Sequence, residues 1–381
     1  MRCKRCQNTD PAYFYFGSKG YYCRKCIKYQ RLLIEEDLKA VSYKLSDSAG
    51  DYHIDYALTE KQAEISAKCC EYIDDCDILL SCVCGAGKTN IVVEVISKYL
   101  KANKKVCFAI PRREVVLELQ SRFAKIFANN KVIAVCGGMH KDLYGDLIVC
   151  TTHQLYRYYH SFDLLIIDEV DAFPFRGDEV LNNIALSSCV GHIIYSTATI
   201  DDELLKFISK RPYKTLNLYE RPHHKPLIVP KVIYGPKFIL YLLILNELRH
   251  ADSQYIVFVE SKKLCKLLYY FYKQFVSITY VYSDLEMRDE NIKAFKDKRF
   301  KHIVATSVLE RGITIDGVNV IVLHVMRAVF TKSAIIQMVG RVGRSFANPY
   351  GVAKIYTSIY DKEVNDSISE LEYANEVSIL R

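Results

Sequence analysis

The chain lacks any long uninterrupted apolar segment. No run among its 381 residues approaches 18 apolar residues, and a membrane-spanning helix needs about 20. The basic stretch from Met1 to Cys6 is not followed by an apolar core, so it does not have the form of a signal peptide. We therefore expect a cytoplasmic protein whose cysteines stay reduced.

Acidic residues are nearly absent from the first 31 positions. This stretch has eight Lys or Arg residues and one acid, Asp10, which gives +7, whereas the whole chain carries +8. A basic end of this kind predicts a polyanionic partner, although a solvated charged face would have the same composition.

Four cysteines in the same stretch form two Cys-x2-Cys pairs. A spacer of 16 residues separates Cys3 and Cys6 from Cys23 and Cys26. This spacing is typical of a tetrahedral four-thiolate zinc site, in which each tight turn supplies two sulfur atoms. Disulfides are disfavoured in a reducing compartment. Because four thiolates leave no open position for water, we expect the zinc to be structural.

Aromatic residues are interleaved with these basic residues. Their rings are able to stack on bases while the cations follow the phosphates of a single strand. We expect about half of the rings to form the small core of the module instead. A helix and a polar connector are expected in residues 32–50. The aromatic residues are Tyr13, Phe14, Tyr15, Phe16, Tyr21, Tyr22 and Tyr29.

A phosphate-binding loop is predicted between an apolar run and a helical pattern. The apolar residues 78–80 lead into C-V-C-G-A-G-K-T at 82–89. Glycines let backbone amides surround phosphate oxygens. Lys88 would reach the β- and γ-phosphates, and the Thr89 hydroxyl would hold Mg²⁺. The first position is Cys82 rather than Gly, so the prediction depends on partner motifs elsewhere.

Acidic residues follow a later apolar strand at 164–167. Asp168 is placed to give Mg²⁺ a carboxylate oxygen, and Glu169 is the candidate base that activates the attacking water. The strand that ends in S-T-A-T at 196–199 offers two hydroxyl residues able to bond Asp171 and relay the state of the nucleotide.

Polar residues also end two other predicted strands. Pro111 and Arg112 follow one strand, and Thr151 and Thr152 follow the next. Ligands bind at the carboxyl edge of a parallel sheet, so these four residues are candidate contacts for a phosphodiester backbone.

The second half repeats the α/β rhythm without a phosphate loop of its own. Arg341 and Arg344 are three residues apart, so we expect both on one face of a helix. Arginines that reach a γ-phosphate from a second domain act as fingers and make hydrolysis depend on domain closure. The sequence therefore predicts a nucleotide site shared by two domains.

The motifs C-V-C-G-A-G-K-T, D-E-V-D, S-T-A-T, E-R-G-I-T and Q-M-V-G-R-V-G-R, in this order, resemble those of superfamily 2 helicases over residues 55–360. In that superfamily a small residue often takes the first loop position, as Cys82 does here. D-E-V-D-A-F-P-F at 168–175 and the four-cysteine module resemble the ComFA-type competence helicases. This resemblance implies a single-stranded-DNA-dependent ATPase that helps draw transforming DNA into Gram-positive cells, near the inner face of the membrane.

The resemblance also implies a fold and its boundaries. We expect two tandem RecA-like α/β domains with parallel sheets, preceded by the small zinc module. The expected parts are a zinc module at 1–45, a first domain at 46–215, a linker at 216–230 and a second domain at 231–381.

Site residues follow from the same resemblance. It gives Gln62 to adenine and makes Lys88, Asp168, Glu169, Arg341 and Arg344 catalytic. The residues implied to bind ATP are Gln62, Gly85, Ala86, Gly87, Lys88, Thr89, Gly312 and Gln337. Those implied to couple nucleotide and nucleic acid are Asp171, Ser196 and Thr199. Those implied to face DNA are Pro111, Arg112, Thr151, Thr152 and Thr306.

The expected cofactors are ATP, Mg²⁺ and structural Zn²⁺, and the expected partners are single-stranded DNA and DNA-uptake proteins at the membrane. A homo-oligomer is left open. Two other functions stay open: a superfamily 2 helicase that acts in DNA repair or restart or on RNA, and a nucleotide-switched nucleic-acid clamp. A clamp would have no need of Glu169 and two finger arginines, which argues against it.

Overall fold

The computed structural model describes residues 1–41, 43, 45–46, 50–139, 141–310, 315–326 and 329–379. The chain divides into two compact units. The first consists of Met1–Cys82 and Lys88–Leu218, and the second of Tyr219–Arg381 together with Val83–Gly87. Within the described ranges, no helix has both the length and the apolar character needed to cross a membrane.

The four-cysteine module is built around a short hairpin. Strands β1 (Phe14–Gly17) and β2 (Gly20–Cys23) pair antiparallel, between the 3-10 turns η1 (Pro11–Tyr13) and η2 (Ile27–Tyr29). The helix expected in residues 32–50 is absent from the part of that segment that the structure describes. Leu33 instead forms an isolated antiparallel bridge with Tyr22, and residues 34–36 bend.

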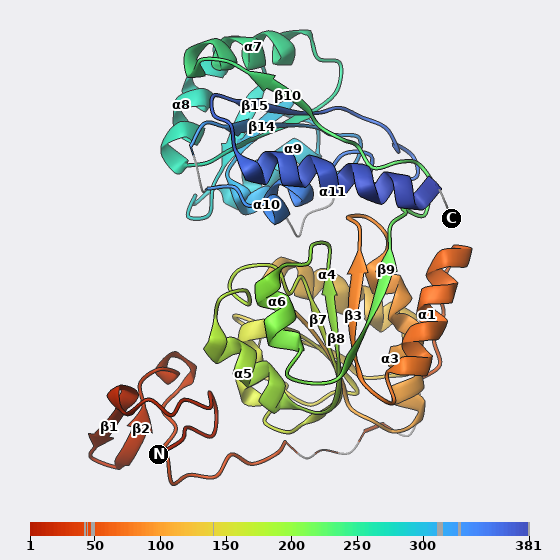
Figure 1. The fold of residues 1–381 in the computed structure, drawn as a ribbon, viewed down its shortest axis with the longest axis vertical. Helices are drawn as coiled ribbons and strands as arrows, with labels where there is room; N and C mark the ends of the chain where they lie inside the picture. The colour runs from red at the N-terminus through yellow and green to blue at the C-terminus, as the bar shows by residue number, and fades with distance from the viewer. Residues whose placement is uncertain are drawn as a thin grey trace. The chain divides into compact units, whose positions relative to one another are not determined.

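The first unit contains a seven-stranded parallel sheet with the strand order β5-β6-β4-β7-β8-β3-β9 (Figure 1). Apolar runs form its central strands, which are buried on both faces, as parallel strands between helices require. The strands are β3 (Asp77–Cys82), β4 (Val106–Ile110), β5 (Val132–Val135), β6 (Leu147–Thr151), β7 (Phe162–Asp168), β8 (Cys189–Thr197) and β9 (Tyr213–Leu218).

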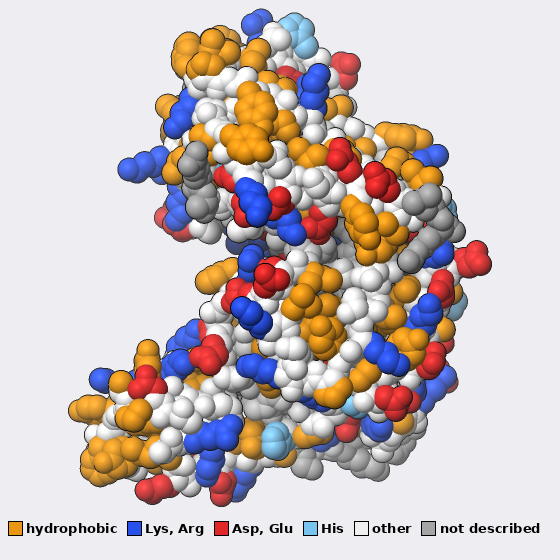
Figure 2. Space-filling model, viewed as in Figure 1, with side chains coloured by type: hydrophobic (Ala, Val, Ile, Leu, Met, Phe, Trp, Pro, Cys, Tyr) orange, Lys and Arg blue, Asp and Glu red, His pale blue; other side chains and the backbone are white. Residues whose placement is uncertain are grey.

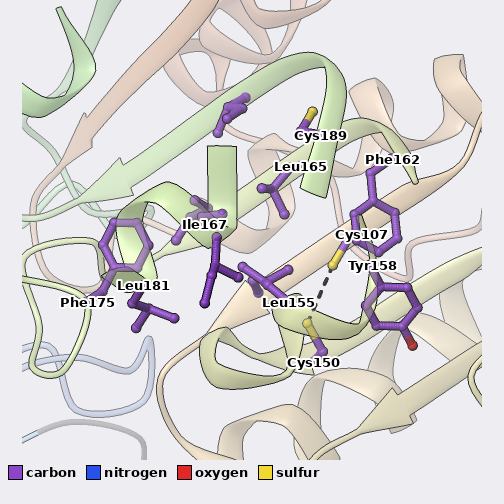
Figure 3. Close-up of a cluster of buried hydrophobic side chains, with 14 of the residues drawn as sticks. Cys107, Cys150, Leu155, Tyr158, Phe162, Leu165, Ile167, Phe175, Leu181 and Cys189 are labelled. Atoms are coloured by element: carbon purple, nitrogen blue, oxygen red, sulfur yellow. Dashed lines mark hydrogen bonds between the residues drawn. The ribbon is translucent and has the colours of Figure 1, made fainter. Parts of the chain in front are cut away.

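Helices cover this sheet. Thr59 caps the first of them, as predicted: its hydroxyl accepts from the backbone of Gln62, and the Gln62 side chain bonds back to Thr59. Figure 3 shows the core on one face, where Tyr158 and Phe175 lie with the strand residues Leu165 and Ile167. The helices are α1 (Glu60–Tyr72), α2 (Lys88–Ile91), α3 (Val93–Lys101), α4 (Arg113–Ile126), η3 (Thr152–Arg157), α5 (Glu179–Ser188) and α6 (Asp202–Ile208).

The second unit contains a six-stranded parallel sheet with the order β10-β15-β14-β11-β13-β12. Helices α7 and α8 pack on one face, and α9, α10 and α11 pack on the other. The strands are β10 (Lys231–Tyr234), β11 (Tyr255–Val259), β12 (Ile278–Val281), β13 (His302–Ala305), β14 (Asn319–His324) and β15 (Ala353–Thr357). The helices are α7 (Lys237–His250), α8 (Lys262–Tyr272), α9 (Arg288–Lys296), η4 (Ser307–Leu309), α10 (Lys332–Val339) and α11 (Lys362–Ile379).

The predicted fold class, two parallel-sheet α/β domains after a four-cysteine module, is confirmed. Sequence reasoning missed the strands β9 and β10. Each is an edge strand with several exposed residues, so neither has the continuous apolar run that marks a central strand. The division between Leu218 and Tyr219 falls inside the linker expected at 216–230.

Candidate nucleotide and metal sites

Three neighbouring strands bring the candidate nucleotide residues to one edge of the first sheet. Strand β8 lies between β3 and β7, and all three run parallel. Ser81 pairs with Thr197, and Asp168 pairs with Ser196. The loop that follows β3 and the acids that end β7 therefore emerge at the same carboxyl edge, where ligands bind in open α/β sheets.

The loop after β3 has the backbone that the glycines predict. Gly85 has a φ of +85° and Gly87 a φ of +82°, a region that side chains with a Cβ adopt only with strain. The Ala86 amide donates to the Val83 carbonyl at 3.1 Å. Lys88 then begins α2 and Thr89 follows it, half-buried.

Cys82, which replaces the first glycine of the motif, is the buried last residue of β3 and is 1% exposed. Burial raises the pKa of its thiol to about 12, while the charge of Lys88 lowers it and that of Asp168 raises it. Both predicted residues are thus close enough to act on this thiol. The cysteine is a neutral packing residue, and nothing in its surroundings opposes a phosphate loop.

Asp168 is oriented by its neighbours as a metal ligand requires. Its Oδ1 accepts from the Ser196 hydroxyl at 2.8 Å and from the Glu169 amide at 3.0 Å. Among the described residues no hydrogen bond to Oδ2 is formed, so that oxygen is available to a metal ion. A carboxylate fixed in this way fits the predicted magnesium site.

Glu169 breaks away from the strand as soon as β7 ends. Its φ of +56° is left-handed, which costs a residue other than glycine roughly 1–2 kcal/mol. The turn is held because the Glu169 carbonyl accepts from the Ala172 amide at 2.9 Å. Such strain at a carboxylate next to a metal ligand is characteristic of functional sites.

The two hydroxyl residues expected to bond Asp171 behave differently. The Thr199 hydroxyl donates to Asp171 Oδ2 at 3.1 Å, as expected. Ser196 bonds Asp168, because the strand register places it opposite that residue, and its coupling role stays a prediction. Ser196 and Thr199 therefore contact two of the three acids of the motif, Asp168 and Asp171.

Gln62 lies 3% exposed in the first turn of α1. Its side-chain oxygen accepts from the Thr59 amide at 3.0 Å, so the capping box fixes how the amide group is oriented. An adenine contact for Gln62 stays a prediction.

The residues expected to face DNA all lie at or just beyond strand ends. Pro111 and Arg112 follow β4 and are half-buried, and Thr306 follows β13 in the same way. Thr151 is the last residue of β6 and Thr152 is the first of η3, and both side chains are buried. Their placement at carboxyl edges is as predicted, and their contacts with DNA stay predictions.

Arg341 and Arg344 do not share a helical face, and that expectation is wrong. Helix α10 ends at Val339, and the chain then turns through Gly343, which has a φ of +63°. Arg341 is 5% exposed and its Nε donates to the Glu310 carbonyl at 3.2 Å, whereas Arg344 is exposed. Gln337 lies half-buried in α10, and Gly312 lies outside the described residues.

Sequence reasoning missed Arg221, in the segment expected to be a linker. Its side chain is 1% exposed. The guanidinium group donates to the carbonyls of Val342 at 2.8 Å, Gly343 at 2.6 Å and Gly340 at 3.2 Å. Arg221 thus holds the turn that carries Arg341 and Arg344. The prolines around it masked this role, since they suggested a solvated connector.

The four cysteines come together as their spacing predicts. All four are buried, and their sulfur atoms lie within 4.8 Å of one another. Cys3 and Cys26 approach to 3.6 Å, and Cys6 and Cys23 to 3.7 Å. Sulfur atoms at zinc–sulfur distances of about 2.3 Å in a tetrahedron are about 3.8 Å apart. The donor set and its size therefore fit zinc.

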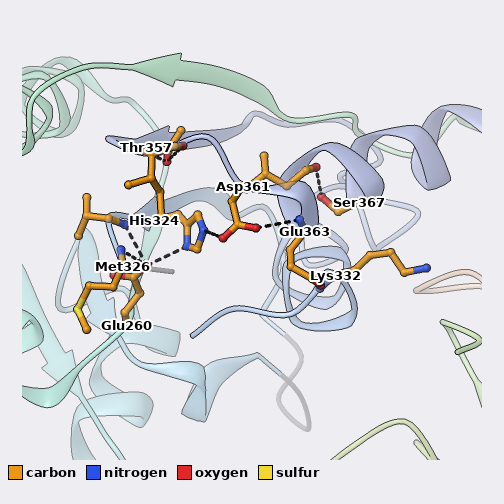
Figure 4. Close-up of polar contacts among 11 residues, drawn as sticks. Glu260, His324, Met326, Lys332, Thr357, Asp361, Glu363 and Ser367 are labelled. Atoms are coloured by element: carbon orange, nitrogen blue, oxygen red, sulfur yellow. Dashed lines mark hydrogen bonds and ion pairs between the residues drawn. The ribbon is translucent and has the colours of Figure 1, made fainter. Parts of the chain in front are cut away.

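A second buried polar cluster lies at the carboxyl edge of the second sheet (Figure 4). His324 ends β14, and its two ring nitrogens lie 2.8 Å from Glu260 and 2.9 Å from Asp361. Burial opposes the charged imidazole, but contacts with the two carboxylates outweigh it and raise the pKa of His324. The cluster ties together the ends of three strands.

Comparison with known proteins places the chain among helicases. Residues 55–202 match the family described as type III restriction enzyme, res subunit, and residues 236–346 match the helicase conserved C-terminal domain. The structure of a single-residue variant of Dbp5 from S. cerevisiae bound to RNA and ADP BeF3 aligns with a TM-score of 0.63 at 17% identity, covering 85% of this chain and 93% of that one. At this identity the likeness shows the fold alone.

Two curated relatives match almost the whole chain. Competence protein ComFA of Streptococcus pneumoniae is 33% identical over 390 residues, which covers 98% of this chain and 90% of that protein. Competence protein ComFA of Bacillus subtilis is 30% identical over 367 residues, with 90% and 79% covered.

The two parallel-sheet domains and their edge motifs define a superfamily 2 helicase, an ATP-dependent motor that acts on nucleic acid. The chain belongs to the ComFA family of competence proteins. The superfamily and the family predicted from the motifs are both confirmed.

Proposed function

We propose that this chain is an ATP-driven single-stranded-DNA translocase that serves the uptake of transforming DNA. The observation that carries the proposal is the edge of the first sheet, where a glycine-bearing loop and a pre-oriented Asp168 emerge from strands joined by β8. Membership in the ComFA family supports the DNA-uptake role, because the curated relatives are named competence proteins.

Nucleotide binding falls to the loop and the residues around it. Backbone amides of the loop surround the phosphates, Lys88 neutralises the terminal phosphates, and Gln62 reads adenine from its fixed position in the capping box. The proposed ATP-binding residues are Gln62, Gly85, Ala86, Gly87, Lys88, Thr89, Gly312 and Gln337.

Hydrolysis follows from the two adjacent acids. Mg²⁺, when bound by Thr89 and Asp168, supplies charge neutralisation at the phosphates. Glu169 orients and deprotonates the water that attacks the γ-phosphate. Arg341 and Arg344 bind the charge that develops on the γ-phosphate in the transition state.

DNA is held at the carboxyl edges by Pro111, Arg112, Thr151, Thr152 and Thr306. Contacts to sugar and phosphate give little sequence preference. The bond from Thr199 to Asp171 and the bond from Ser196 to Asp168 link the DNA-facing edge to the magnesium site. Through these two bonds, the state of the bound nucleotide changes the affinity for single-stranded DNA.

Structural zinc is proposed at Cys3, Cys6, Cys23 and Cys26. We also propose that the protein works at the inner face of the membrane with DNA-uptake proteins, as its family membership suggests. These partners do not follow from the geometry of the chain.

Steady-state ATP hydrolysis with single-stranded DNA tests the proposal. Lys88→Ala and Glu169→Gln should each abolish DNA-stimulated turnover, and Glu169→Gln should still bind ATP. Glu71→Gln, an exposed acid on α1, is the matched control and should leave turnover unchanged. Substantial turnover in either site variant would contradict the assigned roles.

The choice of nucleic acid is tested in the same assay. RNA of equal length should stimulate hydrolysis less than DNA, and stronger stimulation by RNA would favour the RNA-helicase alternative. ATP binding without any turnover in the unaltered protein would favour a nucleotide-switched clamp.

A further inference from the structure

The four-cysteine module presents two different sides. One side is packed on the first unit, and the other carries aromatic and basic side chains that face solvent. Figure 2 shows hydrophobic and basic side chains gathered over the position that β1 and β2 occupy in Figure 1. The two sides use different residues, so their roles are separable.

The packed side uses its cations for docking. Lys25 Nζ lies 2.8 Å from Glu179, and Lys28 Nζ lies 2.7 Å from Asp178. The Asn183 side chain donates to the Cys6 carbonyl at 2.9 Å, and Tyr29 is buried at 4% exposure. Both acids stand at the start of α5, so the charge of these lysines is neutralised by the first unit itself.

The solvent side keeps its cations available. No carboxylate of the described residues forms an ion pair with Lys19, Arg24 or Arg31, which are all exposed. Arg24 instead lies over the ring of Tyr15 at 4.6 Å, and Arg31 over that of Tyr22 at 4.5 Å. A guanidinium group in this position retains its outward donors for a phosphate.

Exposed rings lie on both faces of the hairpin: Tyr15 lies on the face of Arg24 and Arg31, and Phe16 and Tyr21 lie on the opposite face. Tyr15 is 49% exposed, Phe16 65% and Tyr21 41%. Phe16 and Tyr21 are direct partners across the hairpin, with ring centres 4.9 Å apart. Strand β2, which carries Tyr21, ends at Cys23 of the four-cysteine cluster, so the cluster fixes the hairpin that holds these rings. Exposed large aromatic groups on such a rigid support mark a binding surface.

We propose that the exposed β1–β2 hairpin binds single-stranded nucleic acid, as a second site separate from the edges of the motor sheets. Bases stack on Tyr15 on one face and on Phe16 and Tyr21 on the other, while Lys19 in the turn and Arg24 and Arg31 on the Tyr15 face contact the phosphates. Rings supply a sequence-tolerant platform and cations follow the backbone, which is the pattern of single-strand binding. An acidic protein would use the cations but would gain little from the rings.

The packed side of the module determines which segment of the first unit lies beside this second site. The segment that begins at Glu169 ends at Asp178, the residue that Lys28 contacts. Phe175, 1% exposed, anchors it in the core, and Arg176 pairs with Asp201 at 2.8 Å. A nucleic-acid strand bound to the hairpin is therefore connected, through Lys28 and Asp178, to the segment that begins at Glu169.

Equilibrium binding of a single-stranded oligonucleotide to the full chain tests the inference. This measurement does not depend on ATP hydrolysis. A fluorescein-labelled oligothymidine is titrated without ATP into protein that carries Lys88→Ala. The triple variant Tyr15→Ala, Phe16→Ala and Tyr21→Ala should bind about tenfold more weakly or worse, since each stacked base is worth severalfold. The control Tyr270→Ala with Phe275→Ala, two exposed rings of which one lies on α8 and the other in the turn after it, should bind normally.

The cations are tested by salt dependence. Arg24→Glu with Arg31→Glu should lower the slope of log affinity against log salt by about 1.4, because each lost phosphate contact removes about 0.7 for single strands. Zinc content of every variant should stay that of the unaltered protein, which shows that the module remains folded.

Photocrosslinking locates the site directly. An oligonucleotide with 5-iodouracil should crosslink to the hairpin rings, and oligouridine should behave like oligothymidine because stacking and phosphates are common to both. Crosslinks confined to the motor domains, with full affinity in the triple variant, would overturn the inference. If the unaltered protein lacks ATPase activity but crosslinks at the hairpin, the proposed function fails and this inference stands.

Discussion

Single hydroxyl and carboxyl groups determine how the candidate nucleotide site is assembled. Ser196 and Thr199 lie at the end of one strand, yet each bonds a different acid, Asp168 and Asp171 respectively. The first bond orients a metal ligand, and the second joins the end of β8 to the loop behind it. Changing one hydroxyl should therefore separate metal binding from coupling.

Thr199→Val should impair coupling and leave basal hydrolysis nearly intact. The substitution keeps the shape but removes the donor to Asp171, and such a bond is worth about 1 kcal/mol. We expect the stimulation of ATP hydrolysis by DNA to fall about fivefold. Thr215→Val, on the exposed edge strand β9, is the matched control. Equal stimulation in both variants would show that the Thr199 hydroxyl has no coupling role.

Arg221 is the residue on which the turn of Arg341 and Arg344 depends. Arg221→Met should lower kcat strongly with little change in KM for ATP, because three buried carbonyls lose charged donors worth about 1.5–3 kcal/mol each. Arg221→Lys should rescue poorly, since an ammonium group lacks the planar fork. The exposed Arg249→Met on α7 is the control, and unchanged kcat in Arg221→Met would contradict this role.

At the scale of elements, buried contacts tie together parts that are distant in sequence. His324 at the end of β14 contacts Glu260 after β11 and Asp361 after β15. The network in Figure 4 thus links the carboxyl ends of three strands in the second sheet. Because the cluster holds two acids and one imidazole, its stability depends on the charge of His324.

The His324 cluster predicts a pH-dependent stability. The raised pKa of His324 means that its contribution is complete below the unfolded value of about 6.5 and is lost as pH rises through the folded value. His324→Gln should lower the free energy of unfolding by about 3 kcal/mol at pH 6. Urea unfolding at pH 6, 7 and 8 should show that difference shrinking as the pH rises. A difference that grows with pH would contradict the positive charge assigned to His324.

The four-cysteine module is the other element with a separable role. Purified protein should contain about one zinc per chain, measured by metal analysis, and Cys23→Ser should lose it together with several degrees of thermal stability. The module packs on the first unit around buried Tyr29, so its loss exposes apolar surface. Cys70→Ser, at a half-buried cysteine outside the cluster, should keep its zinc. Retained zinc in Cys23→Ser would exclude the four-thiolate site.

At the scale of the whole molecule, the formal charge of +8 is concentrated near the N-terminus. The affinity of the full chain for single-stranded DNA should therefore fall steeply with salt, by about 0.7 log units per tenfold change in salt for each phosphate neutralised. Titrations at several salt concentrations measure this slope. A flat dependence would mean that phosphates contribute little to binding, against both proposed DNA sites.

Much of this molecule was predictable because its signals are local. The phosphate loop, the acids after β7 and the cysteine spacing each combine special residues within a few positions. Apolar runs at 78–80 and 164–167 identified central strands, since both faces of those strands are buried. The cap at Thr59 is a contact between residues three apart, so sequence alone could reveal it.

Sequence reasoning was wrong or silent where a residue's role depends on a distant partner. The bridge at Leu33 depends on Tyr22, the partner of Ser196 depends on strand register, and Arg221 depends on carbonyls more than a hundred residues away.

The sequence by itself determined the superfamily, the family and the types of side chain at the candidate nucleotide and zinc sites, because short motifs specify them. Only the tertiary structure decided which acid Ser196 and Thr199 each bond, and that helix α10 ends before Arg341. It also decided which side of the four-cysteine module packs on the first unit. These outcomes result from packing and from long-range hydrogen bonds, whose energies depend on distance in space and have no signature in a local pattern.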